Sequence, residues 1–221
     1  MNIQVTVMSR KKKWVWGITI AALVIGIGIV GMRVVWMHYG KPEMPDRTNY
    51  KTLAERAKKG LAFAKRHNMN ERYALFVDYS VPSGTPRLYV WDFKSNKVIK
   101  SIHTMHGVGG GSTAEHPRFS NKLGSECSTL GRFLVTKEQG LRLRRSFRIK
   151  GMDTDNQTAY GRGLMIHAAK WVDRWSKKKY IPLNRECCKG CVTVSSSGMS
   201  YLYALIIKEQ KPLLLWNYES K

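Results

Sequence analysis

Two short apolar runs near the C-terminal end decide the fold: Leu164-Met165-Ile166-His167-Ala168, and Cys187-Cys188-Lys189-Gly190-Cys191-Val192-Thr193-Val194. Short runs that are rich in Val, Ile and Leu and bounded by Gly or polar residues are typical of buried strands. The first run carries one histidine, and in the second run a Gly-Cys pair leads directly into the apolar residues. We predict one strand in each run, over Gly163–Ala168 and Cys191–Val194.

His167 and Cys191 are the residues of these runs that can carry chemistry. A single His on an apolar strand is most often a core residue, and a single Cys is most often a small buried hydrophobe. These two residues flank one loop, however, and a thiol needs a nearby base to become a nucleophile at neutral pH. Gly190 lets the backbone turn tightly before Cys191, so that amide N–H groups can converge on an oxyanion. The pair therefore indicates a thiol nucleophile.

The cysteines allow two other kinds of chemistry. Cys188 and Cys191 have the Cys-x-x-Cys spacing of dithiol oxidoreductases, but those motifs open a helix, whereas this one runs into a predicted strand. Zinc binding is the second alternative, although one Cys-x-x-Cys without a second close pair is a weak zinc signal. Its ligands would be Cys187, Cys188, Cys191 and either His167 or Cys127. A disulfide between two of Cys127, Cys187 and Cys188 also remains open.

The surrounding sequence predicts one mainly β (β-rich α+β) domain with flanking helices. Apolar residues recur at helical spacing from Leu53 to Ala64, so we expect a helix over Lys51–His67 and another over Met199–Lys208. Gly107–Ser112 is glycine-rich but lacks the Gly-Lys-Ser/Thr end of a P-loop, which favours a flexible loop. The other expected strands, separated by turn residues, are Tyr73–Asp78, Arg87–Phe93, Val98–Thr104, Gly131–Thr136, Leu141–Ile149 and Leu213–Tyr218.

An uncharged apolar segment runs from Trp14 to Met32. As a helix it extends about 28 Å, which is close to the thickness of the bilayer hydrocarbon. Arg10–Lys13 precede it, and Arg33 follows where a cleaved signal peptide would have small residues, so we expect an uncleaved single-pass anchor with its N-terminus in the cytoplasm. The expected parts are a cytoplasmic basic tail (1–13), a transmembrane anchor (14–37), a linker (38–50) and a periplasmic domain (51–221). The anchor would lie in the cytoplasmic (inner) membrane.

The composition excludes some classes of protein and of binding partner. A hydrophobic fraction of 43% excludes a disordered chain, and four cysteines are too few for a disulfide scaffold. Five of the 38 basic residues flank the apolar segment, and the other 33, against 15 acidic residues, leave +18 on the rest of the chain. Because no helix-turn-helix, zinc-finger or RNP-like motif accompanies this charge, nucleic acid is not an expected partner. The charge then points to an anionic membrane or another acidic polymer, and composition does not choose between them.

The motifs around His167 and Cys191 resemble the YkuD-type L,D-transpeptidase catalytic domain family of bacterial cell-wall enzymes, in its murein transpeptidase branch. That family places a His on a strand and then a Ser/Thr-x-Gly-Cys element with the nucleophile, and here Cys188 takes the Ser/Thr position. Thr193 stands where Asn or Arg is frequent, and Ala168 follows the His where Ser or Gly is common. The resemblance covers roughly residues 72–218 and includes Phe119-Ser120-Asn121, Ser125, Ser128-Thr129-Leu130-Gly131, Phe133, Arg162 and Trp171-Val172.

The resemblance implies cysteine acyl transfer on peptidoglycan stem peptides, without a metal or an organic cofactor. Cys191, activated by His167, would attack the bond after the diamino acid of a stem tetrapeptide and release D-Ala. An amine of a second stem, or water in an L,D-carboxypeptidase reaction, would resolve the acyl-enzyme. The N–H groups of Gly190 and Cys191 would hold the oxyanion, and a backbone carbonyl would orient His167. The residues implied to line the substrate cleft are Arg162, Ser125, Ser128 and Trp171.

Two other functions are alternatives to this one. A non-catalytic cell-wall-binding or scaffold protein on the same fold is suggested by the basic surface and by the departures at Cys188 and Thr193. A Cys-x-x-Cys thiol–disulfide oxidoreductase is the more distant alternative.

Overall fold

The computed structural model describes residues 26, 28, 47–140, 143 and 145–220. Apart from residues 26, 28 and 47–50, the predicted tail (1–13), anchor (14–37) and linker (38–50) lie outside the described residues. No helix in the described part of the chain has the length and apolar character that crossing a bilayer requires. The described residues from Arg47 onward belong to one compact unit.

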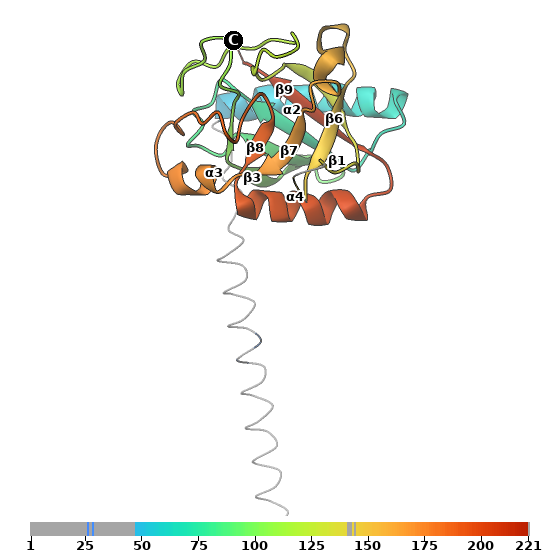
Figure 1. Ribbon diagram of the computed structural model, residues 1–221. Coiled ribbons are helices and arrows are strands. Elements are labelled where there is room, and N and C mark those ends of the chain that lie inside the picture. Colours follow the sequence, from blue (N-terminus) through green and yellow to red (C-terminus); the bar gives the residue numbers. More distant parts are fainter. Residues whose placement is uncertain (1–25, 27, 29–46, 141–142, 144, 221) are drawn as a thin grey trace, which may run out of the picture. The chain divides into compact units, whose positions relative to one another are not determined.

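Nine strands form a single mixed sheet in the order β3-β2-β1-β9-β5-β6-β7-β8-β4 (Figure 1). Two neighbouring pairs, β1–β9 and β7–β8, are parallel, and the other pairs are antiparallel. The strands are β1 (Tyr73–Asp78), β2 (Leu88–Asp92), β3 (Lys97–Ile102), β4 (Thr104–Met105), β5 (Gly131–Val135), β6 (Phe147–Gly151), β7 (Met165–Ala168), β8 (Val192–Val194) and β9 (Leu213–Tyr218). The helices are α2 (Arg47–Arg66), the 3-10 helix η1 (Thr154–Ala159), α3 (Lys170–Trp175) and α4 (Ser196–Lys208).

The sheet curls into a barrel-like shape because its two outer strands are adjacent in the chain. β3 and β4 lie at opposite ends of the strand order, yet only His103 separates them. The N–H of Ser195, just after β8, donates to the His103 carbonyl at 3.2 Å and ties this corner to the other edge of the sheet. The single strand predicted over Val98–Thr104 is therefore two strands that pair with different neighbours.

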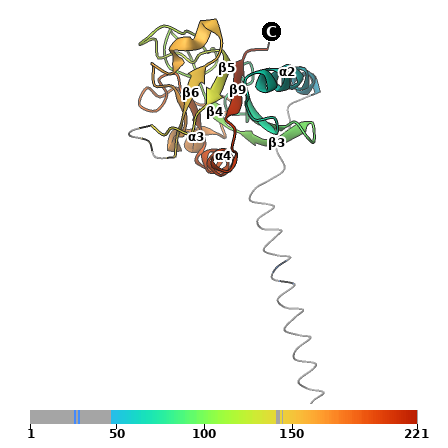
Figure 2. The same ribbon diagram turned by 90° about the vertical axis from the view of Figure 1, so that its right-hand side faces the viewer.

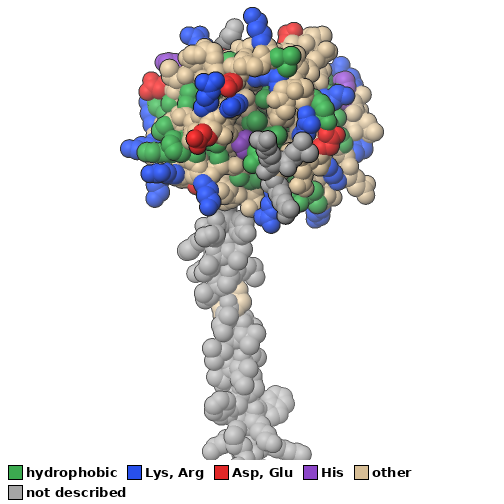
Figure 3. Space-filling model, viewed as in Figure 1, with side chains coloured by type: hydrophobic (Ala, Val, Ile, Leu, Met, Phe, Trp, Pro, Cys, Tyr) green, Lys and Arg blue, Asp and Glu red, His purple; other side chains and the backbone are tan. Residues whose placement is uncertain are grey.

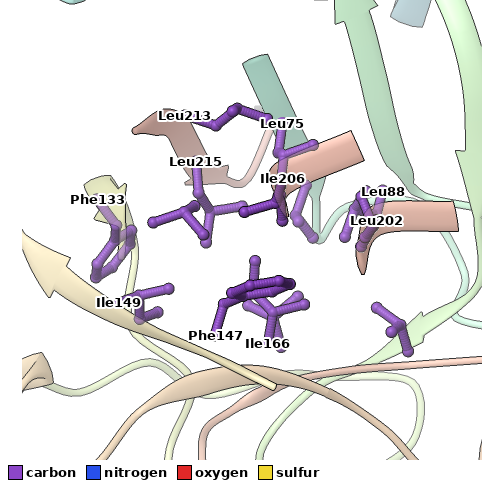
Figure 4. Packing of buried hydrophobic residues seen from close by; sticks show 14 of the residues in the cluster. Leu75, Leu88, Phe133, Phe147, Ile149, Ile166, Leu202, Ile206, Leu213 and Leu215 are labelled. Atoms are coloured by element: carbon purple, nitrogen blue, oxygen red, sulfur yellow. The ribbon is translucent and has the colours of Figure 1, made fainter. Parts of the chain in front are cut away.

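Helices α2 and α4 cover different sides of the sheet (Figures 1 and 2). In β1, Phe76 packs in the cluster with α2, and its neighbour Leu75 packs in the cluster with α4. In β9, Leu214 and Leu215 alternate in the same way. The central strands are thus buried on both faces, which explains why their sequences read as continuous apolar runs. Figure 4 shows part of the cluster on the α4 side, where side chains of β5, β6 and β7 meet those of α4 and β9.

The predicted mainly β class is confirmed. β1 and β9 have the predicted bounds, whereas α2 and α4 each begin earlier than predicted. The sequence pattern did not predict α3 or η1. Residues 141, 142 and 144 of the strand predicted over Leu141–Ile149 lie outside the described residues, and β6 begins at Phe147. Arg145 adopts a φ of +58°, and the Ser146 hydroxyl bonds to nearby backbone, so the chain turns at this point.

Candidate active site

Strands β7 and β8 bring His167 and Cys191 together. They are parallel neighbours in which His167 lies opposite Thr193, and Cys191 immediately precedes β8. Cys191 itself packs against the apolar cluster that also contains Ile166 and Val192. His167 is buried and only 6% exposed, and Cys191 is half-buried. The fold therefore places a shielded imidazole on one strand and a half-buried thiol directly before the neighbouring strand.

The connection between β7 and β8 has a small core of its own. Parallel strands need a crossover connection, which α3 and the segment after it provide. Val172, Ile181 and Cys188 are fully buried in this small core, together with Met105 of β4. The N–H of Ile181 also donates to the Ser83 hydroxyl at 2.8 Å. These contacts fix both ends of the segment that carries the Gly190-Cys191 pair.

The imidazole of His167 has a defined tautomer. Its Nδ1 lies 3.1 Å from the Ala168 carbonyl oxygen, which can only accept, so Nδ1 carries the proton and Nε2 is the basic nitrogen. Nε2 lies 3.2 Å from the Thr193 hydroxyl. Burial lowers the pKa of His167, and the hydrogen bond to the Ala168 carbonyl opposes this effect. The Ala168 carbonyl thus has the position of the backbone carbonyl that we expected to orient the His167 ring.

The thiol of Cys191 is shielded and faces groups that favour its ionised form. Burial raises the pKa of this thiol, whereas the Met165 N–H and the Arg162 guanidinium lower it. Among the described residues, neither ring nitrogen of His167 is hydrogen-bonded to the thiol. Catalytic contacts are often long in a ligand-free protein and shorten when substrate binds.

Gly190 and Gly107 pack backbone against backbone beside Cys191. Gly190 has a φ of +100°, and a Cβ on it would overlap with the Cys127 carbonyl oxygen. A Cβ on Gly107 would lie 2.8 Å from the Gly190 backbone. The Gly107 N–H donates to the Ser128 hydroxyl at 2.9 Å, and the Val108 N–H donates to the Cys188 carbonyl at 3.2 Å. The predicted loop at Gly107–Ser112 is present, and in this part of it glycine serves close packing.

Cys188 occupies the Ser/Thr position of the Ser/Thr-x-Gly-Cys element described above. It is fully buried, and its thiol donates to the Cys191 carbonyl oxygen at 3.4 Å. Burial raises the pKa of Cys188 to about 12, so this thiol is neutral at physiological pH. The motif leads into β8, a strand, and both of its cysteines are free thiols.

Arg162 holds the loop that precedes β5. One Nη group donates to the Ser120 carbonyl at 2.8 Å and to the Thr129 hydroxyl at 2.6 Å, and the other donates to the Cys127 carbonyl at 2.6 Å. Burial lowers the pKa of the guanidinium, and the Cys127 and Cys191 thiols oppose this effect. The structure thus places Arg162 beside Cys191, with three of its N–H donors bound to protein groups.

The other predicted cleft residues have different surroundings. Ser128 is fully buried, and its hydroxyl accepts from Gly107. Ser125 is half-buried with a shielded, unpartnered hydroxyl in the loop against Gly109. Trp171 donates from Nε1 to the Pro182 carbonyl at 2.8 Å and packs on Trp175. These contacts stabilise the loops around the thiol.

Thr193 and the Ala168 carbonyl complete the surroundings of His167. A backbone carbonyl was expected to orient the ring, whereas the motifs gave Thr193 no role, because its place opposite His167 depends on the register of β7 with β8. No group of three or more His, Cys, Asp or Glu side chains in the described ranges is arranged to hold a metal ion.

A curled β sheet with a buried imidazole on one strand and a half-buried thiol directly before the neighbouring strand has the groups that acyl transfer needs. The family model of the L,D-transpeptidase catalytic domain matches residues 45–216. The chain belongs to this family, which is a family of peptidoglycan-related transpeptidases. The resemblance seen in the sequence is thereby confirmed.

Solved structures similar to this chain have low sequence identity to it. They include the helical cell shape determining protein Pgp2 from Campylobacter jejuni (12% identity, TM-score 0.43, 68% of this chain and 49% of that chain). Another is the LD transpeptidase LdtMt1 in complex with imipenem (12%, 0.39, 66% and 59%). A third is an L,D-transpeptidase from Xylanimonas cellulosilytica (15%, 0.37, 66% and 60%). The chain thus spans about half to three fifths of their lengths, and no curated protein matches it at a significant level.

Proposed function

We propose that the protein is a peptidoglycan L,D-transpeptidase that forms an acyl-enzyme on Cys191. The observation that supports this proposal is that His167 lies on β7, the parallel neighbour of the strand that Cys191 leads into, and that the Ala168 carbonyl leaves Nε2 of His167 as the basic nitrogen. Family membership supplies the reaction class. The basic surface, on which Lys and Arg are spread with few acidic side chains between them (Figure 3), suits an acidic wall polymer.

In the first half of the reaction, Nε2 of His167 takes the thiol proton, and the thiolate attacks the carbonyl carbon after the diamino acid of a stem tetrapeptide. Backbone N–H groups of Gly190 and Cys191 stabilise the oxyanion, an effect commonly worth about 3–4 kcal/mol. When the intermediate collapses, the C–N bond breaks, and His167 returns the proton to the amine of the leaving D-Ala. A thioester remains on Cys191.

In the second half, an amine of another stem attacks the thioester, and His167 accepts the proton of that amine and returns it to the departing thiolate. Water as the acceptor gives the carboxypeptidase reaction. Both halves of the proposed reaction need only the thiol, the imidazole and backbone donors, so no step draws on a cofactor.

We also propose that residues 14–37 anchor the protein in the cytoplasmic membrane, with 1–13 in the cytoplasm and 51–221 in the periplasm after a linker at 38–50. The uncharged segment between Arg10–Lys13 and Arg33 supports this arrangement. Full-length protein should stay in carbonate-washed membranes, and a form lacking residues 1–37 should be released. Release of the full-length protein would contradict the anchor.

A carbapenem tests the nucleophile. We expect the intact protein to gain the mass of one carbapenem, and Cys191→Ala to gain none, because the acyl group needs the thiolate. Cys187→Ala is the matched control, since Cys187 is the other half-buried free thiol, and it should react like the unmodified protein. An adduct formed on Cys191→Ala at the unmodified rate would show that Cys191 is not the nucleophile.

A further inference from the structure

Among the described residues, Thr193 has the one side chain that is hydrogen-bonded to the basic nitrogen of His167. It is fully buried in β8 directly opposite the histidine. Its hydroxyl lies 3.2 Å from Nε2 and 3.1 Å from the Cys187 carbonyl oxygen. A hydroxyl has one proton to donate and can also accept, so the direction of these two bonds depends on the charge of the ring.

The number of bonds differs between the two charge states of His167. In the neutral ring, Nε2 and the Cys187 carbonyl are both acceptors, and the single hydroxyl proton of Thr193 can serve only one of them. In the imidazolium, Nε2–H donates to the Thr193 hydroxyl, and that hydroxyl donates to the Cys187 carbonyl. The Ala168 carbonyl accepts from Nδ1–H in both states. The charged ring therefore makes one more hydrogen bond without any movement of heavy atoms.

Few other groups near the site could stabilise a charged ring. No carboxylate in the described ranges forms an ion pair with His167. The titratable and charged groups that face the site are the thiols of the loop before β8, Arg162 on the segment before β7, Tyr79 directly after β1 and the buried Arg87 directly before β2. Burial disfavours the charged form of His167, which makes the Thr193 acceptor more important.

We propose that Thr193 is a positioning residue that stabilises protonated His167 and thereby the ion pair between the imidazolium and the Cys191 thiolate. The inference rests on the proposed function, since it gives the imidazole the role of the base. It also gives a role to Thr193, which stands at a position where the resembling family often has Asn or Arg. In the described structure the Thr193 hydroxyl, and not the thiol, is hydrogen-bonded to Nε2, so loss of the hydroxyl removes this acceptor from the charged ring and should disfavour proton transfer from the thiol.

The variants Thr193→Val and Thr193→Ser separate the hydroxyl from the shape of the side chain. Thr104→Val is the matched control, because Thr104 is an equally buried threonine on β4 whose hydroxyl donates to the Thr193 backbone carbonyl at 2.9 Å and does not meet the imidazole. Thr193→Ala serves as a second deletion of the hydroxyl if the valine variant does not fold. All variants are made in the full-length protein.

The measurement is the rate at which iodoacetamide alkylates Cys191, followed by peptide mapping from pH 5 to pH 10. We expect Thr193→Val to react about tenfold more slowly near pH 7 and to approach the unmodified rate at high pH, where the thiol ionises without help from the imidazole. Thr193→Ser and Thr104→Val should stay within about threefold of the unmodified rate. In a Cys191→Ala background, Thr193→Val should also lower the pKa of His167 measured by NMR.

Three results would overturn the inference: an unchanged pH profile in Thr193→Val, an equal loss in Thr104→Val, or a loss that persists equally at every pH. In each of these cases His167→Gln would still slow alkylation, and the proposed function would stand. If His167→Gln leaves both alkylation and carbapenem acylation unchanged, the histidine is not the base. That result would contradict the proposed function, which assigns the base to His167.

Discussion

Two buried histidines of this domain, His106 after β4 and His167 in β7, face neighbours of opposite character. Nδ1 of His106 lies 3.0 Å from a guanidinium nitrogen of Arg87, and its Nε2 lies 2.8 Å from the Thr113 carbonyl. Arginine can only donate, so Nδ1 of His106 must accept and Nε2 carries the proton. A second proton on His106 would point at a cation. His167 instead has a carbonyl at one nitrogen and a hydroxyl at the other, and both tolerate a charged ring.

The comparison shows that burial alone does not make a histidine catalytic. Both rings are shielded, and burial lowers the pKa of both. Burial and the Arg87 charge together lower the pKa of His106 to about 4, so this ring stays neutral and serves the structure. Its role is to accept from Arg87, a fully buried cation that no carboxylate of the described residues pairs with at ion-pair distance. The neighbours of a buried ring decide whether it can exchange a proton.

The largest expected effect separates the two histidines by function. His167→Gln should slow carbapenem acylation about 100-fold or more, because general-base catalysis commonly contributes a factor of this size. His106→Gln should stay within a few-fold of the unmodified rate, since a glutamine amide can both accept from Arg87 and donate to the Thr113 carbonyl. The rates are measured by intact-protein mass after mixing. Equal losses of acylation rate in the two variants would show that the two histidines do not differ in function.

The next effect concerns stability as a function of pH. The pKa of His106 is about 4 in the folded protein and 6.5 in the unfolded chain, so between these values only the unfolded chain binds the proton. The stabilisation is complete above pH 6.5 and is lost as the pH falls to 4, by about 3 kcal/mol in total. Urea unfolding at pH 7.5 and 4.5 measures this loss.

His106→Gln provides the control for this pH effect, because it removes the titrating ring and leaves the other charges in place. Its free energy of unfolding should fall much less between the two pH values. A loss as steep as that of the unmodified protein would show that other groups, such as the many cations of this chain, cause the acid sensitivity.

The smallest expected effect concerns Cys188. Cys188→Ser keeps a donor toward the Cys191 carbonyl, so acylation should stay within about threefold of the unmodified rate. If the protein instead worked by a dithiol mechanism, the reaction would require the Cys188 thiol, and Cys188→Ser would abolish it. A loss of 100-fold or more in a folded Cys188→Ser variant would contradict the structural role given to this thiol.

The predictable parts of the molecule are those that depend on local sequence. β1 and β9 are continuous apolar runs bounded by turn residues, and their bounds followed from this pattern. His167 and Cys191 stood out because each adjoins such a run, and the family match agrees with the resemblance that they suggested.

The unpredicted parts depend on contacts between residues far apart in the sequence. Helix α3 has only six residues, and its Val172 is buried against Met105 and Ile181 in a cluster that the sequence pattern cannot reveal. The packing of Gly107 against Gly190 joins segments more than 80 residues apart. The hydroxyl of Thr193 acquires its role only through the register of β8 with β7.

The central claim is that Cys191 and His167 perform acyl transfer on stem peptides, and muropeptide analysis of purified wall tests it most directly. Wall is incubated with full-length protein in detergent, either unmodified, Cys191→Ala or His167→Gln, and then digested. We predict new cross-links between the diamino acids of two stems, or tripeptides where water is the acceptor, with the unmodified protein and neither product with Cys191→Ala. The same products from Cys191→Ala, or an unchanged wall with all three proteins, would contradict the account.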